Sequence, residues 1–203
     1  MKLLKILTVT VLVCFLALAV MPIHGEAGVY DKVLRLHVIA NSDSEEDQNL
    51  KLAVRDAVLE LCAPSLSACH TREEARATLL QMSDEIAAAA RETLLSFGCE
   101  DIVSVTLLEE RFPRKQYESL CFPAGSYLSL CVRIGEAAGQ NWWCVLFPPI
   151  CTAAATATSK RDEDIFVAAG FTPEQYRVIT ESDGVTYRVR FKLLEIFTDA
   201  FRK

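Results

Sequence analysis

The chain has 203 residues, 51% hydrophobic and 24% charged, which suits one packed globular domain and excludes a disordered chain. Its formal net charge of −6 at pH 7 excludes binding to nucleic acid or to an anionic membrane surface through a general electrostatic attraction. A protein or a small molecule remains as the class of partner.

Residues 1–27 have the organisation of an export signal. Lys2 and Lys5 precede an uncharged apolar run from Ile6 to Val20, as in a secretory signal peptide. That run is shorter than the roughly 20 apolar residues that cross a ~30 Å hydrocarbon core. We therefore predict a cleaved signal peptide, or an N-terminal membrane anchor, at 1–27 and a single exported domain at 28–203.

The exported domain is predicted to begin with a strand and a helix. The run KVLRLHVIAN (32–41) alternates with a period of two, which indicates a strand. The run SDSEEDQNLKLAVRDAVLELC (42–62) follows with apolar residues at helical spacing. Ser44 is its predicted N-cap, with acidic residues in the first turn, where the helix dipole favours negative charge. A loop that contains Pro64 is predicted to end this helix.

One long helix and two strands come next. The segment 71–98 keeps a 3.6-residue apolar period, with Thr71 and Glu74 in the register of a capping box and Gly98 at the C-cap. The runs DIVSVTLLEERF and YLSLCVRIG alternate as strands do. Gly135 to Gln140 has the length of a hairpin loop. It leads to NWWCVLF (141–147), which is apolar on both faces and is predicted to be a central or doubly covered strand.

The tail is predicted to add further elements after a small, polar linker at 152–161. Thr172 and Pro173 have the pattern of a helix start, and an Asp-Gly turn precedes the predicted strand VTYRVRF (185–191) and a closing amphipathic run. The order βα-αβ-ββ-αβα predicts a single α+β domain. Its helices would cover a largely antiparallel sheet of about five strands.

His37, Asn41 and Asp43 form a first candidate site, because they lie where the first strand gives way to the first helix. Ligands gather at such junctions in α/β proteins. The acidic residues that crowd this helix start oppose a phosphate and are explained by capping and solvation. We therefore interpret the three residues as a structural polar site, with catalysis by His37 as the alternative.

The cysteines predict a disulfide but no metal site. Seven of the eight cysteines follow the signal segment, and the spacings Cys62 to Cys69 and Cys144 to Cys151 are both C-x6-C. This differs from the C-x2-C spacing of zinc sites and thiol oxidoreductases. A bond between Cys144 and Cys151 would close the loop that holds two adjacent prolines.

The enzymatic alternative is a Cys-dependent hydrolase with Cys144 as nucleophile and His37 as base. An apolar strand around Cys144 would raise its thiol pKa, which disfavours this alternative. The sequence contains none of the common hydrolase, P-loop, dinucleotide-binding or zinc-protease motifs. We therefore predict a binding or signalling module without a catalytic site or a cofactor.

The stretch QNWWCVLFPPIC (140–151) has two readings besides the nucleophile. The first is a core strand, with Trp142 and Trp143 on opposite faces, that ends in a stiff proline turn. The second leaves one tryptophan partly exposed as a binding anchor, since tryptophans are enriched at interface hot spots.

Three blocks of the sequence together resemble the stage II sporulation protein R family of endospore-forming bacteria. They are RLHVIANSDSEEDQNLKLAVRDAVL (Arg35 to Leu59), IGEAAGQNWWCVLFPPIC (Ile134 to Cys151) and VRFKLLEIF (Val189 to Phe197), in that order behind a signal sequence. The first two blocks are long and unusual in composition. The resemblance extends over most of the chain from Val33 to Phe197.

The resemblance implies a signalling protein that is made in the forespore and exported into the space between the forespore and mother-cell membranes. There it would activate a membrane-embedded aspartic protease of the mother cell, which cleaves the precursor of the early mother-cell sigma factor. It implies no catalytic residue and no small-molecule substrate, and membrane contact only through the N-terminal segment. We expect Gly135, Gly139, Asn141, Trp142 and Trp143 to contact the protease.

Overall fold

The computed structural model describes residues 6–12, 14, 28–117, 120–150 and 159–180. The strands are β1 Leu34–Ile39, β2 Val103–Phe112, β3 Lys115–Tyr117, β4 Leu120–Phe122, β5 Gly125–Ile134 and β6 Asn141–Phe147. The helices that follow β1 are α3 Glu45–Ser67, α4 Arg72–Gln81, α5 Ser83–Ser96, α6 Ser159–Ala168 and α7 Pro173–Thr180. No helix in these ranges is both long and apolar enough to cross a membrane.

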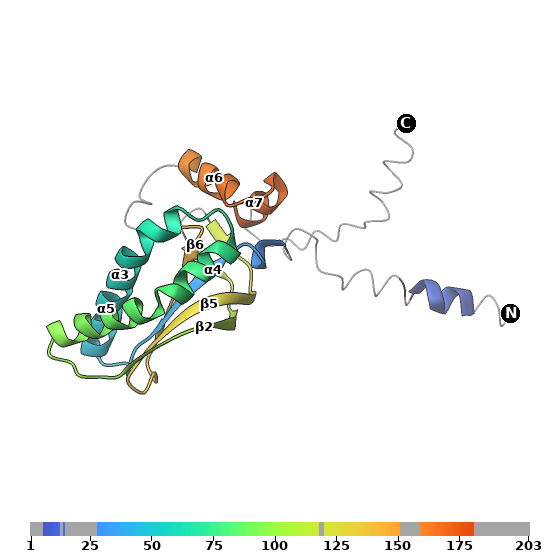
Figure 1. Cartoon of the computed structure of the whole chain (residues 1–203). Helices are drawn as coiled ribbons and strands as arrows, with labels where there is room; N and C mark the ends of the chain where they lie inside the picture. Colours follow the sequence, from blue (N-terminus) through green and yellow to red (C-terminus); the bar gives the residue numbers. More distant parts are fainter. Residues whose placement is uncertain (1–5, 13, 15–27, 118–119, 151–158, 181–203) are drawn as a thin grey trace.

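A four-stranded sheet with the order β2-β5-β1-β6 forms the centre of the fold. β2 pairs with β5 and β6 pairs with β1 in antiparallel orientation, whereas β1 and β5 are parallel. The helices α3, α4 and α5 cover one face, and α6 and α7 lie together at one end of the molecule (Figure 1). The predicted α+β class with a largely antiparallel sheet is confirmed; the predicted strand at 185–191 lies outside the described residues.

The predicted hairpin between β5 and β6 is wrong, because β1 lies between these two strands. The loop 135–140 instead crosses the end of β1, where Ala138 N donates to Asn41 O and Gly139 N donates to Ala40 O, both at 3.0 Å. Among the described strands β6 therefore lies at the edge of this sheet, so of the two predicted options it is the covered strand rather than the central one. Its apolar faces result from cover by α3 on one side and by Tyr117 on the other. Alternation in a sequence indicates a strand but not its neighbours.

The first predicted helix extends one turn beyond the expected end, because α3 continues through Pro64 to Ser67. A proline so close to the end removes only one backbone hydrogen bond. The buried Leu66 holds this last turn against the core, and Ser67 Oγ donates to Ala63 O at 2.7 Å. The predicted N-cap is confirmed, since Ser44 Oγ accepts from Asp47 N at 3.1 Å.

The predicted helix over 71–98 is divided into α4 and α5 at Met82, whose ψ of 2° departs from helical geometry. Met82 N still bonds to Thr78 O, and Ile86 N bonds to Met82 O. The break lets α4 contact β1 while α5 packs against α3 and β2. One residue with altered backbone angles leaves the apolar period intact, so the sequence pattern does not reveal it. Gly98 has the predicted positive φ, at 77°.

The face of the sheet away from α3 to α5 carries a buried arginine. Arg35 is fully buried, and its guanidinium lies 4.2 Å from the ring centroid of Phe112 and 5.0 Å from that of Tyr127. The β3-β4 hairpin, which the sequence did not reveal, supplies Tyr117 and Phe122 at 5.8 Å each. Arg35 Nη2 donates to the Tyr117 hydroxyl at 2.5 Å. Burial lowers the pKa of Arg35.

Arg35→Lys is expected to lower the free energy of unfolding by about 2 kcal/mol, because a compact ammonium loses the stacking on the rings and is more strongly hydrated. Urea unfolding at constant m-value measures this change. Arg76→Lys on the exposed surface of α4 is the control and should change stability by less than about 0.5 kcal/mol. An equal effect of both substitutions would show that the aromatic cage adds no stability.

Cys62 makes the stability depend on alkaline pH. Burial raises the pKa of its thiol from 9.0 to about 12. The unfolded chain therefore loses this proton at a lower pH than the folded chain. The contribution of the Cys62 thiol to the free energy of unfolding is complete below pH 9 and is lost as the pH rises toward 12. Between these values the wild type should lose up to about 1.4 kcal/mol per pH unit more than Cys62→Ala. Urea midpoints across this range measure both slopes, and parallel slopes would contradict the prediction.

Candidate functional site

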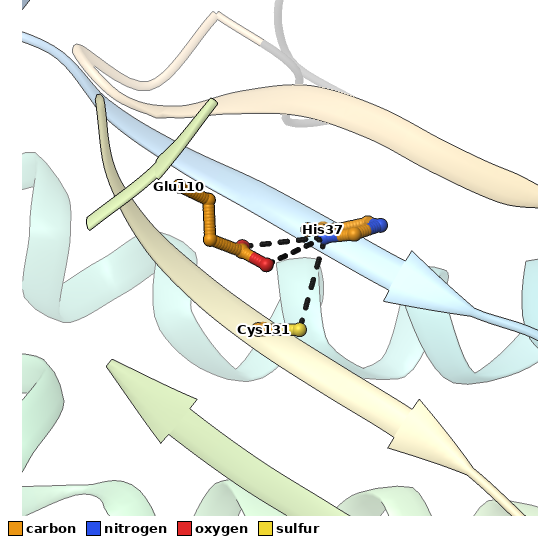
Figure 2. Close-up of side chains that lie close together, drawn as sticks. All are labelled: His37, Glu110 and Cys131. Atoms are coloured by element: carbon orange, nitrogen blue, oxygen red, sulfur yellow. Dashed lines mark hydrogen bonds and ion pairs between the residues drawn. The ribbon is translucent and has the colours of Figure 1, made fainter. Parts of the chain in front are cut away.

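A cluster of a histidine, a glutamate and a cysteine lies on the face of the sheet opposite α3 to α5. Figure 2 shows His37, Glu110 and Cys131, with the carboxylate and the sulfur directed toward the imidazole ring. They come from the adjacent strands β1, β2 and β5. His37 and Cys131 are paired in the parallel β1-β5 ladder, so their side chains lie side by side on one face.

The three side chains are close enough to interact directly. His37 Nδ1 lies 3.2 Å from Glu110 Oε2, 3.3 Å from Glu110 Oε1 and 3.8 Å from Cys131 Sγ. His37 is 5% exposed, Cys131 is fully buried and the Glu110 side chain is 14% exposed. The cluster is therefore nearly closed to water.

Neighbouring residues hold the imidazole in one orientation. Its Nε2 lies 2.7 Å from Asn141 Oδ1, at the start of β6. Trp143 stacks on the ring, with centroids 3.7 Å apart and planes inclined by 19°. Arg133 lies at the rim, 3.9 Å from the second carboxylate oxygen of Glu110 and 39% exposed. The Arg133 guanidinium therefore lies between the cluster and the solvent.

The cluster does not contain a reactive thiol. Burial and the neighbouring Glu110 carboxylate raise the pKa of the Cys131 thiol to about 11. At neutral pH the sulfur keeps its proton, and a protonated thiol is a poor nucleophile. The arrangement fits hydrogen bonding or coordination better than covalent catalysis.

The enzymatic alternative that paired Cys144 with His37 does not fit the structure. Cys144 is aligned with Leu36 and Trp143 with His37 in the β1-β6 ladder, so Cys144 and His37 project from opposite faces. Cys144 is also disulfide-bonded, which removes the free thiol that a nucleophile needs. Its predicted partner, Cys151, lies outside the described residues, so that pairing stays a prediction.

Asn41 and Asp43 do not join His37 but hold the loop 135–140. Asn41 Oδ1 accepts from Glu136 N at 3.0 Å, and Asp43 Oδ1 accepts from Gln140 N at 2.7 Å. Lys51 of α3 also donates to Gln140 O at 3.1 Å. The structural role predicted for the two polar residues agrees with these bonds, while their grouping with His37 does not.

Gly135 and Gly139, the two glycines predicted to contact the protease, occupy positions of the loop that a larger residue would strain. Gly135 has φ of 55°, a conformation that side chains rarely adopt. A Cβ at Gly139 would lie 2.2 Å from Ser42 O, because the loop backbone passes directly over the chain that leaves β1. The loop is thus fitted closely to the end of β1.

The two tryptophans are both half-buried and lie on opposite faces, as the alternation predicted. Trp143 belongs to the His37 face. Trp142 lies on the helix side, where the Arg55 guanidinium is 4.3 Å from its ring centroid. Its Nε1 is buried and has no hydrogen-bond partner among the described residues.

Sequence reasoning missed Glu110 and Cys131. They lie 73 and 94 residues from His37 along the chain, and no short motif joins them. The alternation of β2 and β5 does place each on a defined face. Only the strand order, with β5 between β1 and β2, brings the three side chains together.

Comparisons with known proteins agree with the sequence resemblance. The family model for stage II sporulation protein R matches residues 30–157. A curated relative, stage II sporulation protein R of Bacillus subtilis (strain 168), is 34% identical over 187 residues, which cover 84% of this chain and 82% of the relative. No solved structure matches the chain. The chain belongs to the stage II sporulation protein R family.

Proposed function

We propose that this protein is an exported sporulation signal that activates a membrane-embedded aspartic protease of the mother cell. Through that protease it triggers processing of the early mother-cell sigma factor precursor. The observation that carries the proposal is the family match over residues 30–157 together with the relative that aligns over most of the chain. The space between the forespore and mother-cell membranes is the site of action.

The chemistry of the described thiols supports a signal rather than a thiol enzyme. Cys144 is bonded and faces away from His37, and the Cys131 thiol, which does lie beside His37, is protonated at neutral pH. Covalent catalysis by cysteine needs a thiolate next to a base. Neither sulfur meets this requirement.

The contact surface that we propose for the protease is the loop 135–140 with the start of β6. Glu136, Gln140 and Asn141 are exposed. The backbone of the loop is held by hydrogen bonds from β1, from Asn41 and from Asp43. A loop that is already ordered loses little conformational entropy on binding, so more of its contact energy contributes to affinity.

Deletion of the gene in its native endospore-forming bacterium is expected to halt development after the asymmetric septum, with the sigma precursor unprocessed. Immunoblots of the precursor during sporulation measure this. A complete copy of the gene should restore processing, and a copy that lacks residues 1–27 should not, because the signal would remain inside the forespore. Normal processing in the deletion strain would overturn the proposal.

Glu136→Arg is expected to weaken binding to the protease about tenfold or more, since it places a bulky cation at the centre of the proposed contact. Co-purification with the detergent-solubilised protease provides the measurement. Glu92→Arg makes the same change of charge on the exposed surface of α5 and should bind like the wild type. Equal binding by both variants would exclude this loop as the contact.

A further inference from the structure

We propose that His37, Glu110 and Cys131 bind a divalent transition-metal ion, with Zn²⁺ as the best match. The proposal concerns a site separate from the exposed loop 135–140 and goes beyond the proposed signalling function. It also departs from the prediction, made from cysteine spacing, that the chain has no metal site. That prediction considered only ligands close together in the sequence, whereas these come from three strands.

The donor atoms select the class of metal. The cluster offers an imidazole nitrogen, a carboxylate oxygen and a sulfur, all within 4.8 Å of one another. These are the three kinds of ligand that proteins use for Zn²⁺. Ca²⁺ and Mg²⁺ prefer sites built from oxygen atoms alone, and a buried cysteine and histidine disfavour them. A borderline-soft ion is therefore the expected occupant.

The distances fit a tetrahedral ion with little rearrangement. Zn²⁺ bonds of about 2.0–2.3 Å separate neighbouring ligand atoms by roughly 3.3–3.6 Å. The Nδ1–Oε2 distance is 3.2 Å and the Nδ1–Sγ distance is 3.8 Å. Rotation of the Glu110 carboxylate about its side-chain torsions supplies the remaining adjustment of these distances. Three protein ligands leave a fourth position for water.

The surroundings of His37 prepare it for coordination. Nε2 lies 2.7 Å from the amide oxygen of Asn141, which can only accept, so Nε2 is the donor. Nδ1 therefore faces Glu110 and Cys131 and is the ring nitrogen that would bind the ion. Metal-binding histidines usually donate their other N–H to an oxygen in this way. The stacked Trp143 ring restricts rotation of the imidazole. Both contacts reduce the entropy that coordination would otherwise cost.

The charges of the site also match a divalent ion. Coordination by Zn²⁺ releases the Cys131 thiol proton to the solvent. The neutral imidazole, the carboxylate and the resulting thiolate then carry two negative charges, so the bound ion makes the buried site neutral. Burial of a neutral site avoids the cost of an uncompensated charge. Arg133 contacts Glu110 from the rim and holds its second oxygen. One oxygen of Glu110 then remains for the metal.

Titration of the purified, chelator-treated full chain with Co²⁺ tests the proposal. We expect one equivalent to bind with a thiolate-to-cobalt charge-transfer band and the intense visible bands of four-coordinate cobalt, and Zn²⁺ to displace it. Cys131→Ser should abolish the charge-transfer band. Cys69→Ser and His70→Gln, which change the same residue types in the turn that follows α3, should keep it. Absence of the band in the wild type would overturn the proposal.

Two further variants keep the test decisive where Cys131→Ser disturbs folding. Glu110→Gln preserves the shape of the side chain but removes its charge, and it should weaken Zn²⁺ binding at least as strongly as the loss of a hydrogen-bond partner of a metal ligand. Asn141→Ala removes such a partner and should weaken binding about 10–100-fold. Competition with a chromogenic chelator measures both affinities, and circular dichroism verifies the fold. Wild-type affinity in folded Glu110→Gln would contradict the assignment.

Discussion

The buried guanidinium of Arg35 is the constraint around which one half of this structure is arranged. A fully buried cation is costly unless its surroundings compensate it. No carboxylate pairs with Arg35 among the described residues; instead four aromatic rings and the Tyr117 hydroxyl surround it. Two of these rings belong to the β3-β4 hairpin, so the hairpin is held to the sheet by the same contacts that stabilise the charge. Arg35 Nε also reaches the Cys144 carbonyl, at 3.4 Å, which ties the edge strand β6 to this centre.

The two faces of β1 serve different purposes, one in the apolar core and the other in polar interactions. Leu34, Leu36 and Val38 are fully buried in the core cluster, whereas Arg35 and His37 carry the polar interactions of the opposite face. Because β5 and β6 lie on either side of β1, the loop between them must pass over its end. That passage explains why Asn41 and Asp43 are polar and why Gly139 has no room for a side chain. The geometry of one strand thus positions both the polar cluster and the proposed contact loop.

Local features could be predicted from the sequence, and pairings between distant segments could not. Ser44, Thr71 and Gly98 mark helix ends through hydrogen bonds and backbone angles that depend on a few neighbouring residues. The same local patterns gave no information on whether β6 pairs with β5 or with β1, because either choice buries its alternating side chains. The alternative that paired Cys144 with His37 therefore used a sulfur that projects from the opposite face, and Cys131, which does lie beside His37, was overlooked. The short β3-β4 hairpin has too few residues for a periodic signal.

Asn141 joins the two parts of the molecule to which we assign functions. It is exposed at the end of the loop 135–140, yet its amide oxygen lies 2.7 Å from His37 Nε2 in the nearly closed cluster. Trp143, two residues further along β6, stacks on the same imidazole. A bond between His37 and a metal ion would therefore restrain the start of β6 through both residues. Asn141 thus connects the polar cluster with the surface that we propose for the protease, and an ion in the proposed metal site would restrain the first residues of that surface.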